Sequence, residues 1–221
     1  MTKNHLKTRS APRTWNIARK VNTFITRPNP GSQKIEMTLP LDTFLRVTNV
    51  ASTKKEINYV IKTSEVLVNG KRRWDRRYGI GFMDVVSFPT LKKHFILSLD
   101  EQGKLAPESV DEKHASTKLV QVTGANKVAG GKLQLHFSDG RNILADKSLQ
   151  RGSTAAIEIP DNKIKTVYAV EPKAHVILTS GKHRGSKGTI EAIDGEFITV
   201  ATKAGSISTK KAYAFVLGGK A

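Results

Sequence analysis

Apolar residues recur at helical spacing in two stretches of the first half of the chain. Pro40 suits a first helical turn, and the apolar residues of 41–45 then form one stripe. Further along, Thr53 and Glu56 fit a capping box, in which each side chain accepts a hydrogen bond from the other residue's backbone N–H. The apolar residues of 57–61 continue on one face. The pattern predicts two short helices in succession.

A hairpin is predicted after the second helix. Residues 66–68 form a short apolar strand, and Asn69-Gly70 follows, a strong two-residue turn because both residue types tolerate positive φ. The chain returns through residues 71–74, and a last strand is expected near 83–88. We therefore expect a compact α/β module in this part of the chain.

The second half of the chain has the pattern of short β-strands. Residues 133–137 alternate strictly between apolar and polar side chains, as in a half-buried strand, and Asp139-Gly140 is a second turn signal. Glycines punctuate short apolar runs after residue 171, which favours a small barrel. Further strands are expected at 157–159, 164–167, 176–179, 189–193, 197–201 and 213–217.

The first 36 residues show no clean period. They contain Pro12, Pro28 and Pro30, with Trp15 and Phe24 scattered among basic residues. This composition predicts an extended basic arm that cannot bury itself alone and becomes ordered on RNA, since isolated aromatics among cations suit stacking and phosphate contact. The alternative is a disordered, solubilising tail.

The net charge of the chain indicates which class of partner it binds. The 221 residues include 37 Lys plus Arg against 19 Asp plus Glu, a formal net charge of +18. Such an excess repels itself in a free protein and fits a polyanion, where cations displace condensed counterions. We find no long apolar run and no strongly amphipathic basic helix, so a membrane is the weaker interpretation. The lack of cysteine excludes disulfides and fits a reducing cytosol.

The positive charge is concentrated in three of four segments. Net charge is +7 in residues 1–36, +6 in 37–98, +1 in 99–170 and +4 in 171–221. The third segment is nearly neutral, a balance of positive and negative charge that is typical of a scaffold or spacer.

A dense basic cluster follows the Asn69-Gly70 turn, with Asp75 the single acid among residues 71–77. A hairpin would project several of these cations into solvent, and we favour phosphate contact over a merely solvated face. Trp74 and Tyr78 are interleaved, and for Trp74 we favour core packing slightly over stacking on bases. The five cations, hereafter the hairpin cluster, are Lys71, Arg72, Arg73, Arg76 and Arg77.

A second basic segment, residues 181–188, lies between two predicted strands. Its glycines let the backbone approach a polyanion closely, and Lys182, Arg184 and Lys187 supply charge beside His183. We favour an RNA contact here over an ordinary hairpin loop.

Catalytic motifs are not found. The run Gly130-Gly131-Lys132 fails as a phosphate loop, because Asn126 stands where a glycine is needed and Leu133 where Ser or Thr is needed. There is no nucleophile elbow and no zinc-protease motif, the six histidines are scattered, and paired carboxylates have the pattern of solvated loops. We expect no enzyme activity, no cofactor, no metal and no small-molecule substrate.

The ordered set of short motifs resembles the archaeal and eukaryotic type of ribosomal small-subunit protein four, over nearly the full length. Each motif alone is weak, but the set in order is specific. The matching positions are His5-Leu6-Lys7, Ala11-Pro12, Trp15, Arg19-Lys20, Arg27-Pro28, Pro30-Gly31, Leu39-Pro40-Leu41, Leu45-Arg46, Val66 to Gly70, Gly81, Met83-Asp84-Val85, Gly131-Lys132, Asp139 to Asn142, Thr179 to Gly188 (the KOW motif) and Tyr213 to Gly218.

The resemblance implies an α+β, multidomain chain: a basic N-terminal arm (1–36), an αL-type RNA-binding module (37–98), a central β domain (99–170) and a C-terminal SH3-like KOW barrel (171–221). Two features of the sequence depart from the family pattern. The second helix is poorer in arginine than the family leads us to expect, and Gly79 stands where proline is common. The chain ends just past the barrel, which favours an archaeal-type member.

The expected function is that of a structural component of the small ribosomal subunit, in the cytoplasm, with small-subunit ribosomal RNA and neighbouring ribosomal proteins as partners. The alternatives are a KOW-type transcription or assembly factor and an RNA-modifying enzyme with an αL targeting module. Residues 95–170 are too short for a catalytic domain, which argues against the enzyme. The expected RNA contacts are Lys7, Arg9, Arg13, Trp15, Arg19, Lys20, Arg27, Lys54, Lys55, the hairpin cluster, Lys182, His183, Arg184 and Lys187.

Overall fold

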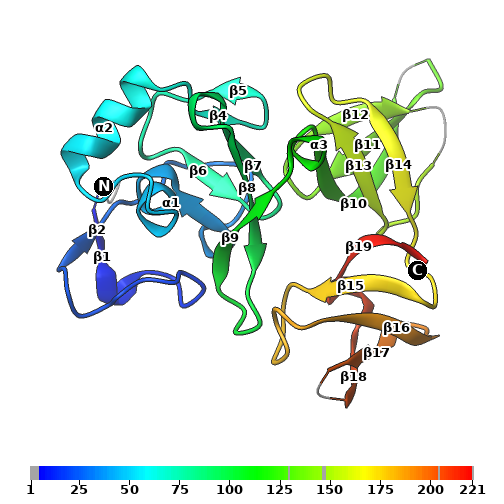
Figure 1. The fold of residues 1–221 in the computed structure, drawn as a ribbon. Coiled ribbons are helices and arrows are strands. Elements are labelled where there is room, and N and C mark those ends of the chain that lie inside the picture. The colour runs from blue at the N-terminus through cyan, green and yellow to red at the C-terminus, as the bar shows by residue number, and fades with distance from the viewer. Residues whose placement is uncertain (1–4, 129, 146–147, 204, 221) are drawn as a thin grey trace. The chain divides into compact units, whose positions relative to one another are not determined.

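The computed structural model describes residues 5–128, 130–145, 148–203 and 205–220. Strands outnumber helices, and the chain divides into two units (Figure 1). Unit 1 comprises Met1–Ser98 and Lys104–Lys118, and unit 2 comprises Leu99–Gly103 and Leu119–Ala221. The fold is therefore mostly β, with several separate sheets.

The N-terminal segment of unit 1 is packed, where the sequence had predicted an extended arm. Strands β1 (Leu6–Lys7) and β2 (Phe24–Ile25) pair antiparallel, with a 3₁₀ turn at Thr8–Ser10 between them. Trp15 is 1% exposed, and its indole Nε1 donates a hydrogen bond to the Ile35 carbonyl oxygen at 3.3 Å. One aromatic side chain thus buries enough surface to hold a segment that has no apolar period.

The two predicted helices are confirmed. Helix α1 (Leu41–Val47) begins after Pro40, and its first five residues are buried. Helix α2 (Lys54–Thr63) begins at a complete capping box: the Glu56 backbone N–H donates to Thr53 Oγ1 at 3.2 Å, and the Thr53 N–H donates to Glu56 Oε2 at 3.3 Å. Ile57 and Ile61 form its buried face, so local capping and apolar spacing agree.

A five-stranded sheet forms much of the rest of unit 1. The predicted hairpin is confirmed, since β4 and β5 pair antiparallel around Asn69 (φ 51°) and Gly70 (φ 73°). The sheet continues across residue 98, which we had taken as a domain boundary. Its order is β5 (Lys71–Arg72), β4 (Leu67–Val68), β7 (Val85–Phe88), β8 (Lys93–Leu99) and β9 (Leu105–Val110).

Smaller elements complete unit 1. Strand β3 (Thr38–Pro40) leads into α1 and pairs antiparallel with β6 (Gly79–Gly81). A short helix, α3 (Glu112–Ala115), follows β9. Two 3₁₀ turns lie at Ile35–Met37 and Pro89–Leu91.

Unit 2 contains two antiparallel five-stranded sheets, each with its own apolar core. The first includes the predicted strand at 133–137, and Leu135, Phe137, Val122 and Ile157 are in its core. Its order is β12 (Asn142–Ala145), β11 (Leu133–Phe137), β10 (Thr117–Lys127), β13 (Thr154–Glu158) and β14 (Ile164–Tyr168).

The second sheet contains all four strands predicted after residue 171, and Val176, Ile190, Ile198 and Val216 lie in its core. A further strand at the edge, β18, was not predicted because four of its six residues are Gly, Ser or Thr. The order is β18 (Gly205–Lys210), β17 (Phe197–Thr202), β16 (Lys187–Asp194), β15 (Ala174–Leu178) and β19 (Ala214–Lys220), with a 3₁₀ turn at Lys211–Tyr213.

Candidate nucleic-acid interface

The turn that presents the hairpin cluster is fixed by side-chain hydrogen bonds. Asn69 Nδ2 donates to Asp84 Oδ1 at 2.9 Å, and the Val85 backbone N–H donates to Asn69 Oδ1 at 3.1 Å. The turn residue is therefore tied at both ends of its amide to strand β7 and the residue before it. The hairpin therefore holds the cations that follow it in a fixed position.

Asp84 is also part of a buried ion pair that no local pattern in the sequence indicates. Lys118 Nζ lies 2.6 Å from Asp84 Oδ1, and both side chains are nearly inaccessible to solvent. The second oxygen of Asp84 accepts a hydrogen bond from the Gly81 N–H at 2.7 Å. Lysine 118 thus stabilises the base of the hairpin from within and does not add to the RNA-facing charge.

Two members of the hairpin cluster, Lys71 and Arg72, are exposed beside an exposed aromatic ring. The Arg72 guanidinium carbon lies 3.7 Å from the centroid of the Trp74 ring, and Trp74 is 62% exposed. Core packing of Trp74 was therefore the wrong expectation: β5 ends at Arg72, which leaves the indole outside the sheet. The result is a flat cation–aromatic surface open to solvent, of the kind on which RNA bases stack.

The other three members of the hairpin cluster are half-buried and have protein partners. The Arg73 guanidinium carbon lies 4.2 Å from the Tyr78 ring centroid. Arg76 Nη1 is 3.7 Å from Asp42 Oδ1, and Arg77 Nε donates to the Arg27 carbonyl oxygen at 3.2 Å. Arg76 thus connects the cluster to α1 and Arg77 connects it to the N-terminal segment, so these guanidiniums are held against the protein.

The N-terminal candidates divide in the same way. Burial of Trp15 leaves no ring face for a base, so the stacking role we expected for it is corrected to one in the core. Arg19 donates to the carbonyl oxygens of Ala11 (3.0 Å) and Pro12 (2.7 Å), which closes the turn of the segment. Arg27 is half-buried. The other candidates of the segment, Lys7, Arg9, Arg13 and Lys20, are exposed.

The first turn of α2 presents Lys54 and Lys55 to solvent beside Glu56. Hydrogen bonds from the backbone N–H groups of Ser52 and then Thr53 lower the pKa of Glu56 from 4.5 to about 2. Glu56 is therefore ionised at the near-neutral pH at which RNA is bound. Its negative charge lies at the start of the helix, where the helix dipole favours an anion.

The segment 181–188 of unit 2 presents Lys182, His183 and Lys187 to solvent. Arg184 is half-buried, and its side chain lies against the turn at residues 99–103. Gly185 has φ of 89°, and a Cβ built there would lie 2.0 Å from the Asp100 carbonyl oxygen. This glycine is therefore required both for its backbone conformation and for close contact with the turn.

Metal sites and membrane-spanning helices are the two other features of interest in the part of the chain that the structure describes. No group of three or more His, Cys, Asp or Glu side chains there is arranged to hold a metal ion. None of the helices there is both long enough and apolar enough to cross a membrane.

Comparison with known proteins gives consistent matches. The family model described as "Ribosomal family S4e" matches residues 91–164, and the RS4NT (NUC023) domain matches residues 2–36. Small ribosomal subunit protein eS4 of Methanosphaera stadtmanae is 34% identical, covering 98% of this chain and 93% of its own length. The protein of that name from Archaeoglobus fulgidus is 33% identical over 100% of this chain and 95% of its own.

A solved structure is also similar. The crystal structure of the 30S ribosomal protein S4e from Thermoplasma acidophilum matches with a TM-score of 0.71 and 26% sequence identity. The match covers 83% of this chain and 96% of that chain.

Proposed function

Because the chain belongs to ribosomal family S4e, as relatives more than 30% identical over nearly its whole length establish, we propose that it holds small-subunit ribosomal RNA through two separate basic surfaces. The chain is a structural component of the small ribosomal subunit. Its partners are ribosomal RNA and other ribosomal proteins, and it acts at the ribosome. We place that ribosome in the cytoplasm, in keeping with the absence of cysteine.

The exposed part of the hairpin cluster, Lys71 and Arg72 with Trp74, is the first surface. This arrangement carries the proposal. The stacked guanidinium donates from Nη2 to the Lys62 carbonyl oxygen at 3.4 Å and has further N–H groups for phosphate, while the indole offers a face to an unpaired base. Recognition of this kind reads RNA shape, backbone and unstacked bases, because the deep groove of an RNA helix hides base edges. The cations of α2 and the exposed cations of the N-terminal segment provide further contacts with phosphate.

The segment 181–188 is the second surface. Three exposed side chains there, Lys182, His183 and Lys187, are supported by a sheet with its own core. That sheet supports an SH3-like KOW barrel for residues 171–221. We further propose an αL-type module within 37–98 and a central β domain in 99–170, from which β9 is excluded because it belongs to the sheet of unit 1. We assign no catalytic role, since family membership points to a structural one.

Salt-dependent binding tests the first surface. Replacing Lys71 and Arg72 by alanine should weaken binding to small-subunit ribosomal RNA and reduce the slope of log affinity against log salt by about two units, one for each lost phosphate contact. The matched control removes two exposed lysines elsewhere, Lys163 and Lys203, and therefore the same net charge. If both double variants change the slope equally, binding follows net charge and the surface has no special part in it.

A further inference from the structure

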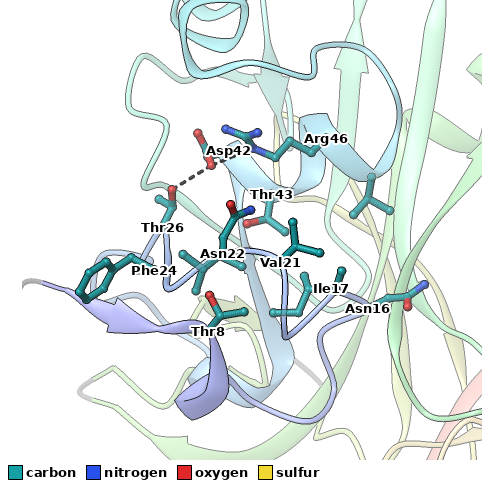
Figure 2. A pocket seen from close by; sticks show the side chains of 13 residues that line it. Thr8, Asn16, Ile17, Val21, Asn22, Phe24, Thr26, Asp42, Thr43 and Arg46 are labelled. Atoms are coloured by element: carbon teal, nitrogen blue, oxygen red, sulfur yellow. Dashed lines mark hydrogen bonds and ion pairs between the residues drawn. The ribbon is translucent and has the colours of Figure 1, made fainter.

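A cleft in unit 1 lies between the N-terminal segment and helix α1 (Figure 2). Its volume is about 480 Å³, within the range of about 300–1,000 Å³ that small-ligand pockets have. Eight residues between Asn16 and Thr26, with Arg19, Lys20 and Thr23 not among them, form one wall, and Asp42, Thr43 and Arg46 of α1 contribute to the other. The RNA contacts proposed above do not include this cleft.

Three buried polar atoms of side chains that line the cleft have no hydrogen-bond partner among the described residues. They are Thr8 Oγ1, Thr43 Oγ1 and Asp42 Oδ1, and each of these residues is only 3% exposed. Asp42 Oδ1 has an ion-pair partner, Arg76 Nη1 at 3.7 Å, which is too far away for a hydrogen bond. Buried polar groups are normally paired, so three such atoms around one cleft indicate an occupant that supplies donors and acceptors. The other oxygen of Asp42 is engaged, accepting from Thr26 Oγ1 at 2.8 Å and lying 3.4 Å from Arg46 Nε.

The rest of the lining suits a flat, partly apolar occupant. Ile17 and Val21 contribute apolar surface, and Asn22 adds an amide that both donates and accepts (Figure 2). At the rim, Val21 is 76% exposed and Phe24 is 57% exposed. Exposed apolar side chains around a polar floor are the setting in which an unstacked base is held by its face and hydrogen-bonded by its edge.

The charge around the cleft favours a nucleotide over a neutral ligand. Arg46 lines the cleft, Arg9 follows the lining residue Thr8, and Lys20 precedes Val21. Asp42 is the single acid among the lining residues, and it is held between Arg46 and Arg76. The surroundings can therefore bind the ribose–phosphate backbone while the floor holds an uncharged ring.

We infer that the cleft takes one unstacked RNA base that carries an exocyclic amine. The amine donates to Asp42 Oδ1, which lies 3.7 Å from Arg76 Nη1 but accepts no hydrogen bond, and the hydroxyl of Thr43 donates to the neighbouring ring nitrogen. This site rests on the proposed function and deepens it, because it adds recognition of a base to contacts with phosphates. A side chain of a neighbouring protein is the competing occupant.

The test is the isosteric variant Thr43→Val, with the exposed Thr23→Val outside the cleft as its control. The probe is a full-length small-subunit ribosomal RNA transcript. Because the Thr43 hydroxyl has no partner in the free protein, Thr43→Val should melt at or above the wild-type temperature. It should bind the transcript roughly tenfold more weakly, with an unchanged salt slope because no phosphate contact is lost. Thr23→Val should behave as wild type.

Dimethyl sulfate probing of the same complexes locates the base. The wild-type protein should protect one unpaired adenine or cytosine that Thr43→Val leaves reactive. A second variant at the rim, Val21→Ser, avoids the buried floor and should weaken binding in the same direction.

Several outcomes would overturn the inference. If both cleft variants bind and protect the transcript as the wild-type protein does, no base occupies the cleft, although the transcript is bound as proposed. Normal binding of the transcript with poor incorporation into subunits would assign the cleft to a protein neighbour. Failure of the wild-type protein to bind the transcript would instead refute the proposed function itself.

Discussion

Arg72 and Arg73 are adjacent in the sequence, but they occupy different environments. Arg72 is exposed and stacks on an exposed indole, whereas Arg73 is half-buried against the Tyr78 ring. The sequence predicted that both would contact RNA as members of the hairpin cluster. The structure restricts that expectation to Arg72, because β5 ends at this residue and the guanidinium of Arg73 lies against the Tyr78 ring.

Single alanine variants should separate the two roles. Arg73→Ala should lower stability by about 1 kcal/mol, the value of a partly buried cation–aromatic contact, and therefore lower the melting temperature by roughly 2–4 °C. Arg72→Ala should melt as wild type and bind ribosomal RNA more weakly. Calorimetry and filter binding on both proteins decide the matter. Equal melting temperatures would show that the Arg73 contact with Tyr78 contributes nothing to stability.

At the scale of elements, α2 owes part of its stability to its capping box. The pKa of Glu56 is about 2 in the folded chain, below its ordinary value of 4.5, because the carboxylate accepts hydrogen bonds from Ser52 and Thr53. A depressed folded-state pKa contributes stability that is fully present above the unfolded value and is lost as the pH falls through the folded one.

The variant Glu56→Gln tests this coupling. At about pH 6 it should melt below wild type, because the charged acceptor is lost. The difference should shrink as the pH falls from about 4.5 towards 2, where wild-type Glu56 becomes protonated. Melting curves across this range provide the measurement. A difference that is independent of pH would mean that the carboxylate charge does not stabilise the helix.

Gly185 of the segment 181–188 and Gly195, further along unit 2, form a matched pair of glycines. Gly185 and Gly195 both have positive φ, but a Cβ at Gly195 would meet nothing within 4 Å, whereas one at Gly185 would meet the Asp100 carbonyl oxygen. Both alanine variants incur the backbone strain, of about 1 kcal/mol or more. Gly185→Ala should in addition displace the turn at 99–103 and lower the melting temperature distinctly further. Similar melting temperatures would indicate that the close contact is not needed.

Local signals in the sequence were sufficient for many elements. The capping box, the Asn69-Gly70 turn and the alternation at 133–137 each depend on a few neighbouring residues, and each is present in the structure. The burial of Trp15 and the ion pair of Asp84 with Lys118 depend on residues far apart in the chain, so no local pattern reports them. The candidate site was foreseen as a set of cations, but which of them face solvent follows from packing.

At the scale of the whole molecule, the net charge of +18 is the dominant property, and packing decides how much of it reaches RNA. Arg19, Arg76 and Arg77 bond to the protein itself, and Lys118 is buried. The exposed cations remain for counterion release, supplemented by an exposed aromatic face and by the cleft under the N-terminal segment. Affinity from these sources is salt-dependent in part, since contacts with bases persist when phosphate contacts are screened.

The central claim is that the chain is a permanent part of the small ribosomal subunit, and sedimentation tests it most directly. Tagged wild-type protein is expressed in an archaeal host, and small subunits are isolated and washed in rising salt. A structural component should remain with the subunits in high salt at one copy for each subunit, because many contacts must be broken at once. Loss in a moderate-salt wash, or recovery at well below one copy, would contradict the account and identify a factor that visits the subunit transiently.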